Sequence, residues 1–242
     1  MQSTIAIVGR GRMGPALARA LSAAGHSVLG PLGRGADAAG ASVVLLCVPD
    51  GQIAAAAAAI PPRDGLVVGH CSGATGLDVL APHEALGLHP LMTVTPEGAA
   101  FAGAGCAVAG STDNARRTAR ALAHSLGMRP FEVADADRAA YHAAAAIASN
   151  FLTTIEAAAE RLAATAGVPR EALVPLVRAS VDNWAALGGE RALTGPIARG
   201  DDATVERHRE TIAARAPDLL PMFDALADAT RALAKLRPEV RA

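Results

Sequence analysis

The sequence has few of the features that mark metal-binding, nucleic-acid-binding or membrane proteins. Its three cysteines, Cys47, Cys71 and Cys106, lie far apart and form no CxxC pair, so neither a disulfide framework nor a metal site is expected. The formal net charge is -1 over 242 residues, which argues against binding to nucleic acid or to a membrane surface. The longest apolar runs, residues 42–48 and 53–60, are far shorter than the roughly 20 residues of a membrane-spanning helix. With no secretion signal at the N-terminus, a cytoplasmic protein is expected.

Short apolar runs recur through the first half of the chain and predict a series of β-strands. The predicted strands lie at residues 4–8, 26–30, 42–50, 66–73, 85–91 and 105–110. Segments 15–24 and 52–60 between them favour helix, and Asp50 is the expected N-cap of the second. Alternation of strands and helices at this spacing predicts an α/β fold with a doubly wound parallel sheet.

The pattern changes after residue 133, and the rest of the chain is typical of helices. Helices are predicted at about residues 136–166, 170–186, 202–214 and 218–235. Glycine-containing turns such as LGGE and LTGPIARGDD separate them. Two domains are therefore expected, residues 1–133 with the sheet and residues 134–242 as an all-α C-terminal domain, with Trp184 packed in the core.

A glycine-rich turn directly follows the first predicted strand. Gly9, Gly11 and Gly14 form the pattern GxGxxG between a strand and a helix, which is the context that dinucleotide binding requires. The first glycine makes a tight turn, the second lets the backbone approach a pyrophosphate, and the third allows close packing of the helix. A Rossmann domain is therefore predicted, and a glycine-rich turn in another doubly wound protein is the alternative. The cofactor contacts predicted in this turn are Gly9, Arg10, Gly11, Arg12, Met13 and Gly14.

The end of the second predicted strand indicates which nicotinamide cofactor binds. An acidic residue about 20 positions after the glycines would accept the ribose hydroxyls of NAD, but the first charged residue in this stretch is Arg34. A guanidinium group suits the additional phosphate of NADP, so NADP is the predicted cofactor. Asp37 leaves NAD as the alternative cofactor, because a small change of loop register would bring its carboxylate to the ribose. Val48, Pro49 and Ser72, near the ends of the third and fourth strands, complete the predicted cofactor site.

Five motifs, in order along the chain, resemble those of one bacterial family. They are VPDGQI (48–53), HCSG (70–73), LHPLMTV (88–94), YHAAAAIASN (141–150) and LTGPIARGD (193–201). Together they are similar to Rossmann-like oxidoreductases whose C-terminal domain has no known function. That family lies in the superfamily of 6-phosphogluconate dehydrogenase, ketopantoate reductase and pyrroline-5-carboxylate reductase. The resemblance implies an NADP-binding oxidoreductase of a small-molecule substrate that forms a homodimer through its helical domain.

The resemblance to the superfamily does not include the lysine that acts as general acid. Ketopantoate reductase and the β-hydroxyacid dehydrogenases place a lysine on the first long helix of the second domain, one turn before an asparagine. Asn150 matches the asparagine, but Ala146 stands one turn earlier, and the only lysine of the chain is Lys235 in the last helix. Either another group donates the proton, or the protein is not a reductase of that kind.

Polar side chains on the alanine-rich helix are the first candidates to replace that lysine. At about 100° per residue, His142, Ser149 and Thr153 lie nearly in line, with Asn150 about 80° away, which predicts one polar stripe. His142 would donate the proton, because histidine titrates near neutrality. Asn150 would orient the substrate, and Ser149 would contact it. The alternative is that these side chains satisfy neighbouring backbone groups.

Three further side chains are candidates at loops. His70 and His89 follow the fourth and fifth strands, where open parallel sheets bind ligands, so both are catalytic candidates. The alternative for each is a hydrogen bond to the backbone of a loop. Thr194 and Arg199 lie on the loop LTGPIARGD, where Arg199 would bind a substrate carboxylate through two hydrogen bonds. The alternative there is that Asp201 or Asp202 caps the helix at residues 203–214 and pairs with Arg199.

The leading functional prediction is an NADP-dependent reductase of a small 2-oxo acid such as ketopantoate. Reduction of an imine such as pyrroline-5-carboxylate is the alternative, because reductases of that type work without the lysine. A non-catalytic NADP-binding sensor or regulatory protein is the second class, and the missing lysine favours it.

Overall fold

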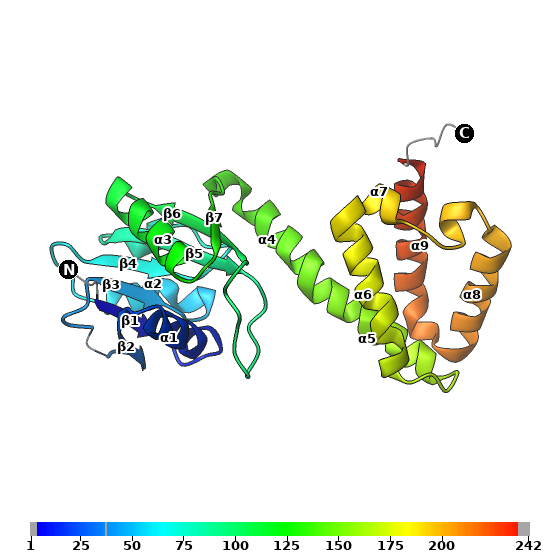
Figure 1. Ribbon diagram of the computed structural model, residues 1–242, viewed down its shortest axis with the longest axis horizontal. Helices are drawn as coiled ribbons and strands as arrows, with labels where there is room; N and C mark the ends of the chain where they lie inside the picture. The colour runs from blue at the N-terminus through cyan, green and yellow to red at the C-terminus, as the bar shows by residue number, and fades with distance from the viewer. Residues whose placement is uncertain (1–3, 37, 237–242) are drawn as a thin grey trace. The chain divides into compact units, whose positions relative to one another are not determined.

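The computed structural model describes residues 4–36 and 38–236. The chain divides into two compact units, Met1–Ser149 and Asn150–Ala242. Figure 1 shows a sheet with its helices in the first unit and helices alone in the second. The boundary expected at residue 134 lies where the sheet ends, and the first unit continues beyond it through helix α4 (Arg138–Ala146).

A seven-stranded sheet forms the centre of the first unit. Its strands are β1 (Thr4–Val8), β2 (Ser27–Leu32), β3 (Val43–Leu46), β4 (Val67–His70), β5 (Glu84–Leu91), β6 (Gly105–Gly110) and β7 (Arg129–Phe131). They lie in the order β2-β1-β3-β4-β5-β6-β7, and β1 to β5 are parallel, as predicted. β6 runs antiparallel to β5 instead, and β7 is parallel to β6. The reversal has a local cause: residues 92–104 contain no helix, whereas parallel strands are usually connected through a crossover helix.

Helices cover both faces of this sheet. Those of the first unit are α1 (Met13–Ala23), α2 (Ile53–Ala58), α3 (Asp113–Ser125) and α4, with 3-10 turns at Asp50–Gln52, Asp78–Leu80 and Asp135–Asp137. Ile5 and Ile7 of β1 belong to one core cluster with residues of α1 and α3. Ala6 and Val8 belong to a second cluster with residues of α2. Because successive side chains of a strand point to opposite faces, both faces of the sheet are buried.

The long helix predicted at residues 136–166 is not a regular α-helix. After α4 the chain passes through a π-helical segment, Ile147–Phe151, and continues as α5 (Leu152–Ala164). A π-helix turns less per residue than an α-helix, so the 100° spacing that aligned His142 with Ser149 does not hold. The predicted polar stripe therefore does not form on one regular helical face.

The second unit consists of helices with a small core. They are α5, α6 (Arg170–Leu187), α7 (Gly189–Ala192), α8 (Asp202–Arg215) and α9 (Leu220–Lys235), with 3-10 turns at Ile197–Arg199 and Pro217–Leu219. Its buried apolar residues within the described part of the chain are Ala158, Val205, Ile212, Ala216 and Ala227. Trp184 is 62% exposed, so the expectation that it packs in the core was wrong, and Leu176 on the same helix is 66% exposed. Among the described helices, none combines the length and the apolarity that crossing a bilayer requires.

Candidate functional site

The glycine-rich turn connects β1 to α1 and is shaped by close backbone contacts. Gly9 has a φ of 129°, and a Cβ atom there would lie 2.1 Å from the carbonyl oxygen of Cys47. A Cβ atom on Gly14 would lie 1.9 Å from the carbonyl oxygen of Gly9. A Cβ atom on Gly11, in contrast, would meet nothing within 4 Å. Gly9 and Gly14 therefore permit the turn and the packing of α1, whereas Gly11 leaves open space for a ligand.

The N-terminus of α1 is suited to bind an anion. Within the described residues, the N-cap residue Arg12 makes no side-chain capping hydrogen bond, and the first turn contains no acidic side chain. The first N–H groups of a helix have no acceptor within the helix, and the helix dipole gives this end a partial positive charge. These properties are the ones that bind phosphate groups at helix N-termini.

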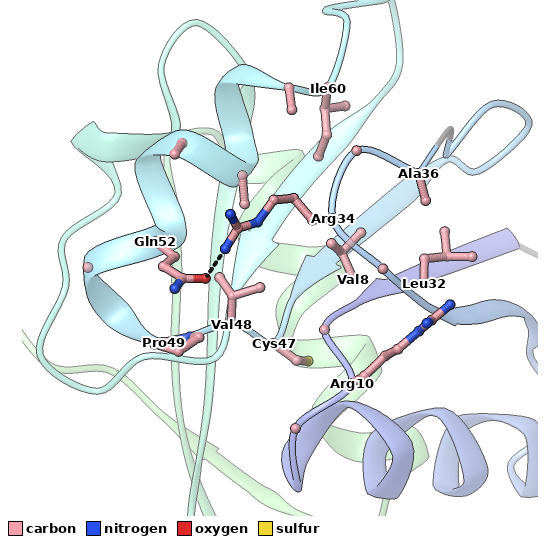
Figure 2. A pocket seen from close by; sticks show the side chains of 18 residues that line it. Val8, Arg10, Leu32, Arg34, Ala36, Cys47, Val48, Pro49, Gln52 and Ile60 are labelled. Carbon is pink, nitrogen blue, oxygen red and sulfur yellow. Dashed lines mark hydrogen bonds between the residues drawn. The ribbon is translucent and has the colours of Figure 1, made fainter.

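A cavity of about 700 Å³ lies beside this turn, at the carboxyl ends of β1, β2 and β3 (Figure 2). Arg34 points across the cavity, and its Nη2 donates a hydrogen bond of 3.3 Å to Gln52 Oε1. Arg10 extends beside Leu32, and a Cβ atom on Gly33 would lie 3.5 Å from its guanidinium carbon. Two exposed guanidinium groups therefore flank the end of β2.

Most of the predicted cofactor residues line this cavity. Those that do are Gly9, Arg10, Gly11, Arg34, Val48 and Pro49. Those that do not are Arg12, Met13, Gly14 and Ser72. Asp37 lies outside the described residues. Gln52 also lines the cavity and was not predicted, although its place in VPDGQI, beside Val48 and Pro49, was an available signal.

His70 is a fully buried residue that holds the loop after β4. The backbone N–H of Ser72 donates to His70 Nδ1 at 3.2 Å. Nε2 therefore carries the ring proton and donates to the carbonyl oxygen of Gly76 at 3.1 Å. Burial lowers the pKa of His70, which keeps this ring neutral. Because both ring nitrogens bond the backbone, the arrangement favours the loop-holding role of His70 over a catalytic one.

Ser72 joins the ends of β3 and β4 through its side chain. Its hydroxyl donates to Asp50 Oδ2 at 2.8 Å and accepts the backbone N–H of Thr75 at 3.0 Å. The prediction that Asp50 caps helix α2 was wrong, because the N-cap residue is Gln52, which makes no side-chain capping bond. The carboxylate of Asp50 is turned to the HCSG loop instead.

A second polar cluster lies at the end of β5, where His89 meets Tyr141 and His142 of α4. The Tyr141 hydroxyl is 2.6 Å from His89 Nδ1, and the two rings meet edge to face at 5.5 Å between centroids. The His142 ring is 6.4 Å from the His89 ring, and Phe131 of β7 packs edge-on against Tyr141 at 5.9 Å. A Cβ atom on Gly73 would lie 2.7 Å from His89 Cε1, so this glycine lets the loop after β4 pack against the ring.

The members of this pair are uncharged at neutral pH. Burial, reinforced by the charge of His142, lowers the pKa of His89 to about 4. Burial also raises the pKa of Tyr141 to about 12. Arg138, whose side chain is 8% exposed and whose Nε lies 2.6 Å from Asp135 Oδ1, places a positive charge near both rings. Tyr141 was not predicted, and the available signal was its position next to His142 in YHAAAA.

The remaining predicted residues belong to other parts of the chain. Ser149 ends the first unit, and Asn150 begins the second at an exposed position. Thr194 and Arg199 are exposed on the connection between α7 and α8. Asp201 accepts a hydrogen bond of 3.1 Å from a backbone N–H in the first turn of α8, which confirms the capping alternative for this residue. Within residues 4–36 and 38–236, no group of three or more His, Cys, Asp or Glu side chains could hold a metal ion.

The sheet, the glycine-rich turn and the adjoining cavity define a protein with a Rossmann-type α/β unit. A family model described as a Rossmann-like domain matches residues 31–96. The family model of a domain of unknown function, DUF2520, matches residues 104–230, which is more than half of the chain. The chain belongs to the DUF2520 family, and the resemblance found in its motifs is confirmed.

Solved structures share this fold over nearly the whole chain. A Bacteroides fragilis protein, BF3122, provisionally named an NADP oxidoreductase, is 19% identical with a TM-score of 0.81, covering 96% of this chain and 98% of its own. Protein TM1727 of Thermotoga maritima is 22% identical with a TM-score of 0.76 and the same coverage. Pyrroline carboxylate reductase of Plasmodium falciparum, crystallised with NADP bound, is 13% identical with a TM-score of 0.63, covering 97% and 99%. No match was found among curated proteins.

Proposed function

We propose that this protein is an NADP-dependent oxidoreductase. The observation that carries the proposal is the cavity beside the glycine-rich turn, where an open glycine, an uncapped helix N-terminus and two arginines converge. These are the parts of a Rossmann dinucleotide site. The names of two similar structures, one provisionally an NADP oxidoreductase and one crystallised with NADP, support the same cofactor.

Each part of the cavity has a role in this proposal. Backbone N–H groups at the start of α1 hold the pyrophosphate, and Gly11 allows its close approach. Arg34 and Arg10, which flank the end of β2, hold the phosphate that distinguishes NADP from NAD. A guanidinium group can donate two parallel hydrogen bonds to the oxygens of one phosphate. Gln52, the present partner of Arg34, releases it when the phosphate arrives.

The proposed substrate is a small 2-oxo acid of the ketopantoate type. Asn150, which matches the asparagine of the superfamily, orients the carbonyl group, while Ser149, Thr194 and Arg199 contact the remainder of the substrate. Reduction of a cyclic imine is the alternative, and the pyrroline carboxylate reductase among the similar structures favours it. A sensor that binds NADP without turnover is a further alternative, favoured by the missing lysine.

The second unit is proposed to form a homodimer. Leu176 and Trp184 of α6 are 66% and 62% exposed, and large exposed apolar side chains are typical of surfaces that bind another protein. Leu176→Asp is expected to convert a dimer into a monomer in analytical ultracentrifugation. A wild-type protein that sediments as a monomer would contradict this part of the proposal.

Titration with NADPH and NADH, followed by cofactor fluorescence, tests the cofactor assignment. Arg34→Gln is expected to weaken NADPH binding by roughly 10- to 100-fold, because a hydrogen bond to a charged group contributes about 1.5–3 kcal/mol. Its NADH affinity should change little. Arg117→Gln, at an exposed position of α3 away from the cavity, is the matched control and should bind as the wild type does.

Loss of NADPH absorbance with a panel of 2-oxo acids and cyclic imines then tests turnover. Oxidation by one class of compound establishes a reductase of that class. Tight NADPH binding without oxidation would favour the sensor, and failure to bind either nucleotide would refute the proposed function.

A further inference from the structure

Tyr141 is the single tyrosine of the chain, and its hydroxyl has a defined position at the carboxyl end of the sheet. The ring lies between Phe131 of β7 and His89 of β5, with edge contacts to both. The hydroxyl is 2.6 Å from His89 Nδ1, and His89 is itself held against the loop after β4 at Gly73. Packing from three strands or their loops therefore fixes one phenol group.

We propose, resting on the proposed function, that Tyr141 is the proton donor of the reduction and that His89 positions its hydroxyl and returns the proton to it. The pair replaces the lysine that the superfamily places four residues before Asn150. His142, whose ring is 6.4 Å from that of His89, then stands beside the donor and is not the donor itself.

The protons and electrons of this step balance. NADPH, when bound, would supply the hydride that the carbonyl carbon accepts, and the C=O π electrons would move to the oxygen. The O–H bond of Tyr141 breaks, and its proton forms the O–H bond of the product alcohol. The Nδ1 proton of His89 moves to the Tyr141 oxygen, while Nε2 takes up from bulk solvent the one H⁺ that the overall reduction consumes. Tyr141 is regenerated, and His89 ends in its other neutral tautomer.

The environment of His89 suits this relay. An imidazole passes a proton in this way only when one ring nitrogen carries a proton and the other is free. Burial is the largest cause of the low pKa of His89, about 4, and positive charge on Arg138, or on the protonated forms of His142 and His70, acts in the same direction. Asp50 opposes them. The ring is therefore neutral across the physiological range.

The identity of the donor also bears on the substrate class. An alkoxide is a stronger base than a phenolate, so a proton moves favourably from Tyr141 to the oxygen that forms in carbonyl reduction. An imine nitrogen needs its proton before the hydride arrives, and a phenol with a pKa raised to about 12 is too weak an acid to supply it. The assignment favours the 2-oxo acid over the cyclic imine.

Nitrogen-15 NMR of the histidines tests the pair without cofactor or turnover. In the wild-type protein, Nδ1 of His89 is expected to show the chemical shift of a hydrogen-bonded nitrogen, and Tyr141→Phe is expected to change it. Identical His89 shifts in the two proteins would overturn the assignment.

Kinetics with the 2-oxo acid test the donor. Tyr141→Phe is expected to lower kcat by roughly 100-fold or more, the scale of general acid catalysis, with KM and the NADPH Kd within about twofold of wild type. His89→Asn keeps an amide group near the position of Nδ1 but cannot relay a proton, so a smaller loss in kcat, with KM unchanged, is expected. His124→Asn, at an exposed position near the end of α3, is the control and should behave as the wild type does.

The outcomes separate this assignment from the proposed function. Wild-type turnover that Tyr141→Phe retains would overturn the assignment alone. A wild-type protein that binds no NADPH, or reduces no compound, would overturn the proposed function and the donor with it. A preference for cyclic imines over 2-oxo acids would also contradict the donor, while leaving an NADP-dependent oxidoreductase in place.

Discussion

Acidification is expected to destabilise the first unit through His89, because the fold holds this ring neutral. In the unfolded chain its pKa returns to about 6.5, whereas in the folded protein burial lowers it to about 4. The unfolded state therefore binds the proton at a higher pH than the folded state does. Stability is complete above the unfolded pKa and is lost as the pH falls toward the folded one.

The size of this effect follows from the two pKa values. Near pH 5 the unfolded state binds about 0.9 proton more at this residue, so the free energy of unfolding falls by about 1.2 kcal/mol per pH unit. Integrated from pH 7.5 to pH 5, the loss is about 2 kcal/mol. His70, whose pKa is also lowered by burial, adds a loss in the same direction.

Urea unfolding followed by circular dichroism at pH 7.5 and pH 5 measures the difference. His89→Asn removes the ionisable ring, so the wild-type protein should lose about 2 kcal/mol more than this variant between the two pH values. His124→Asn, the matched surface control, should lose as much as the wild type. Equal losses in the wild type and in His89→Asn would refute the claim that burial holds His89 neutral.

Three further predictions concern the glycine-rich turn and the N-cap of α8. Gly9→Ala is expected to reduce the free energy of unfolding by at least about 3 kcal/mol, because its Cβ would lie 2.1 Å from a carbonyl oxygen at a φ of 129°. Gly11→Ala, which meets no atom within 4 Å, should keep wild-type stability in urea and weaken only NADPH binding. Asp201→Ala should cost about 1 kcal/mol by removing the cap of α8, measured by hydrogen exchange of that helix, whereas Asp201→Asn should retain most of the stability.

The sequence predicts the sheet well because its strands are short apolar runs bounded by glycine or proline. Strand direction is a different matter: GCAVAG contains nothing that tells a parallel from an antiparallel strand. The preceding segment, residues 92–104, decides it by lacking a crossover helix. Helix α3 was missed because its buried face is mostly alanine, at Ala115, Ala119 and Ala123. A face of that kind is hard to tell from the alanine background of this sequence.

Some residues of the candidate site could be placed from the sequence, and others could not. Arg10 and Arg34 could be placed at the cavity beside the glycine-rich turn because they follow strands at fixed offsets in a known turn geometry. The meeting of Tyr141 and His89 could not, because 52 residues separate them and their contact depends on how α4 packs at the end of β5. His70 looked like His89 in sequence, since both lie near the carboxyl ends of strands, His70 in β4 and His89 in β5. Only the three-dimensional hydrogen bonds distinguish the ring held by the backbone from the ring held by a phenol.

Tyr141 lies near the start of α4, at a different place from the lysine of the related reductases. Tyr141, His89 and the glycine-rich turn all belong to one compact unit, residues 1–149. A lysine at the position of Ala146 would stand three residues before the end of that unit, next to the π-helical segment. The phenol instead is packed against β5 and β7. The position of the proposed proton donor is therefore set by packing contacts within the first unit.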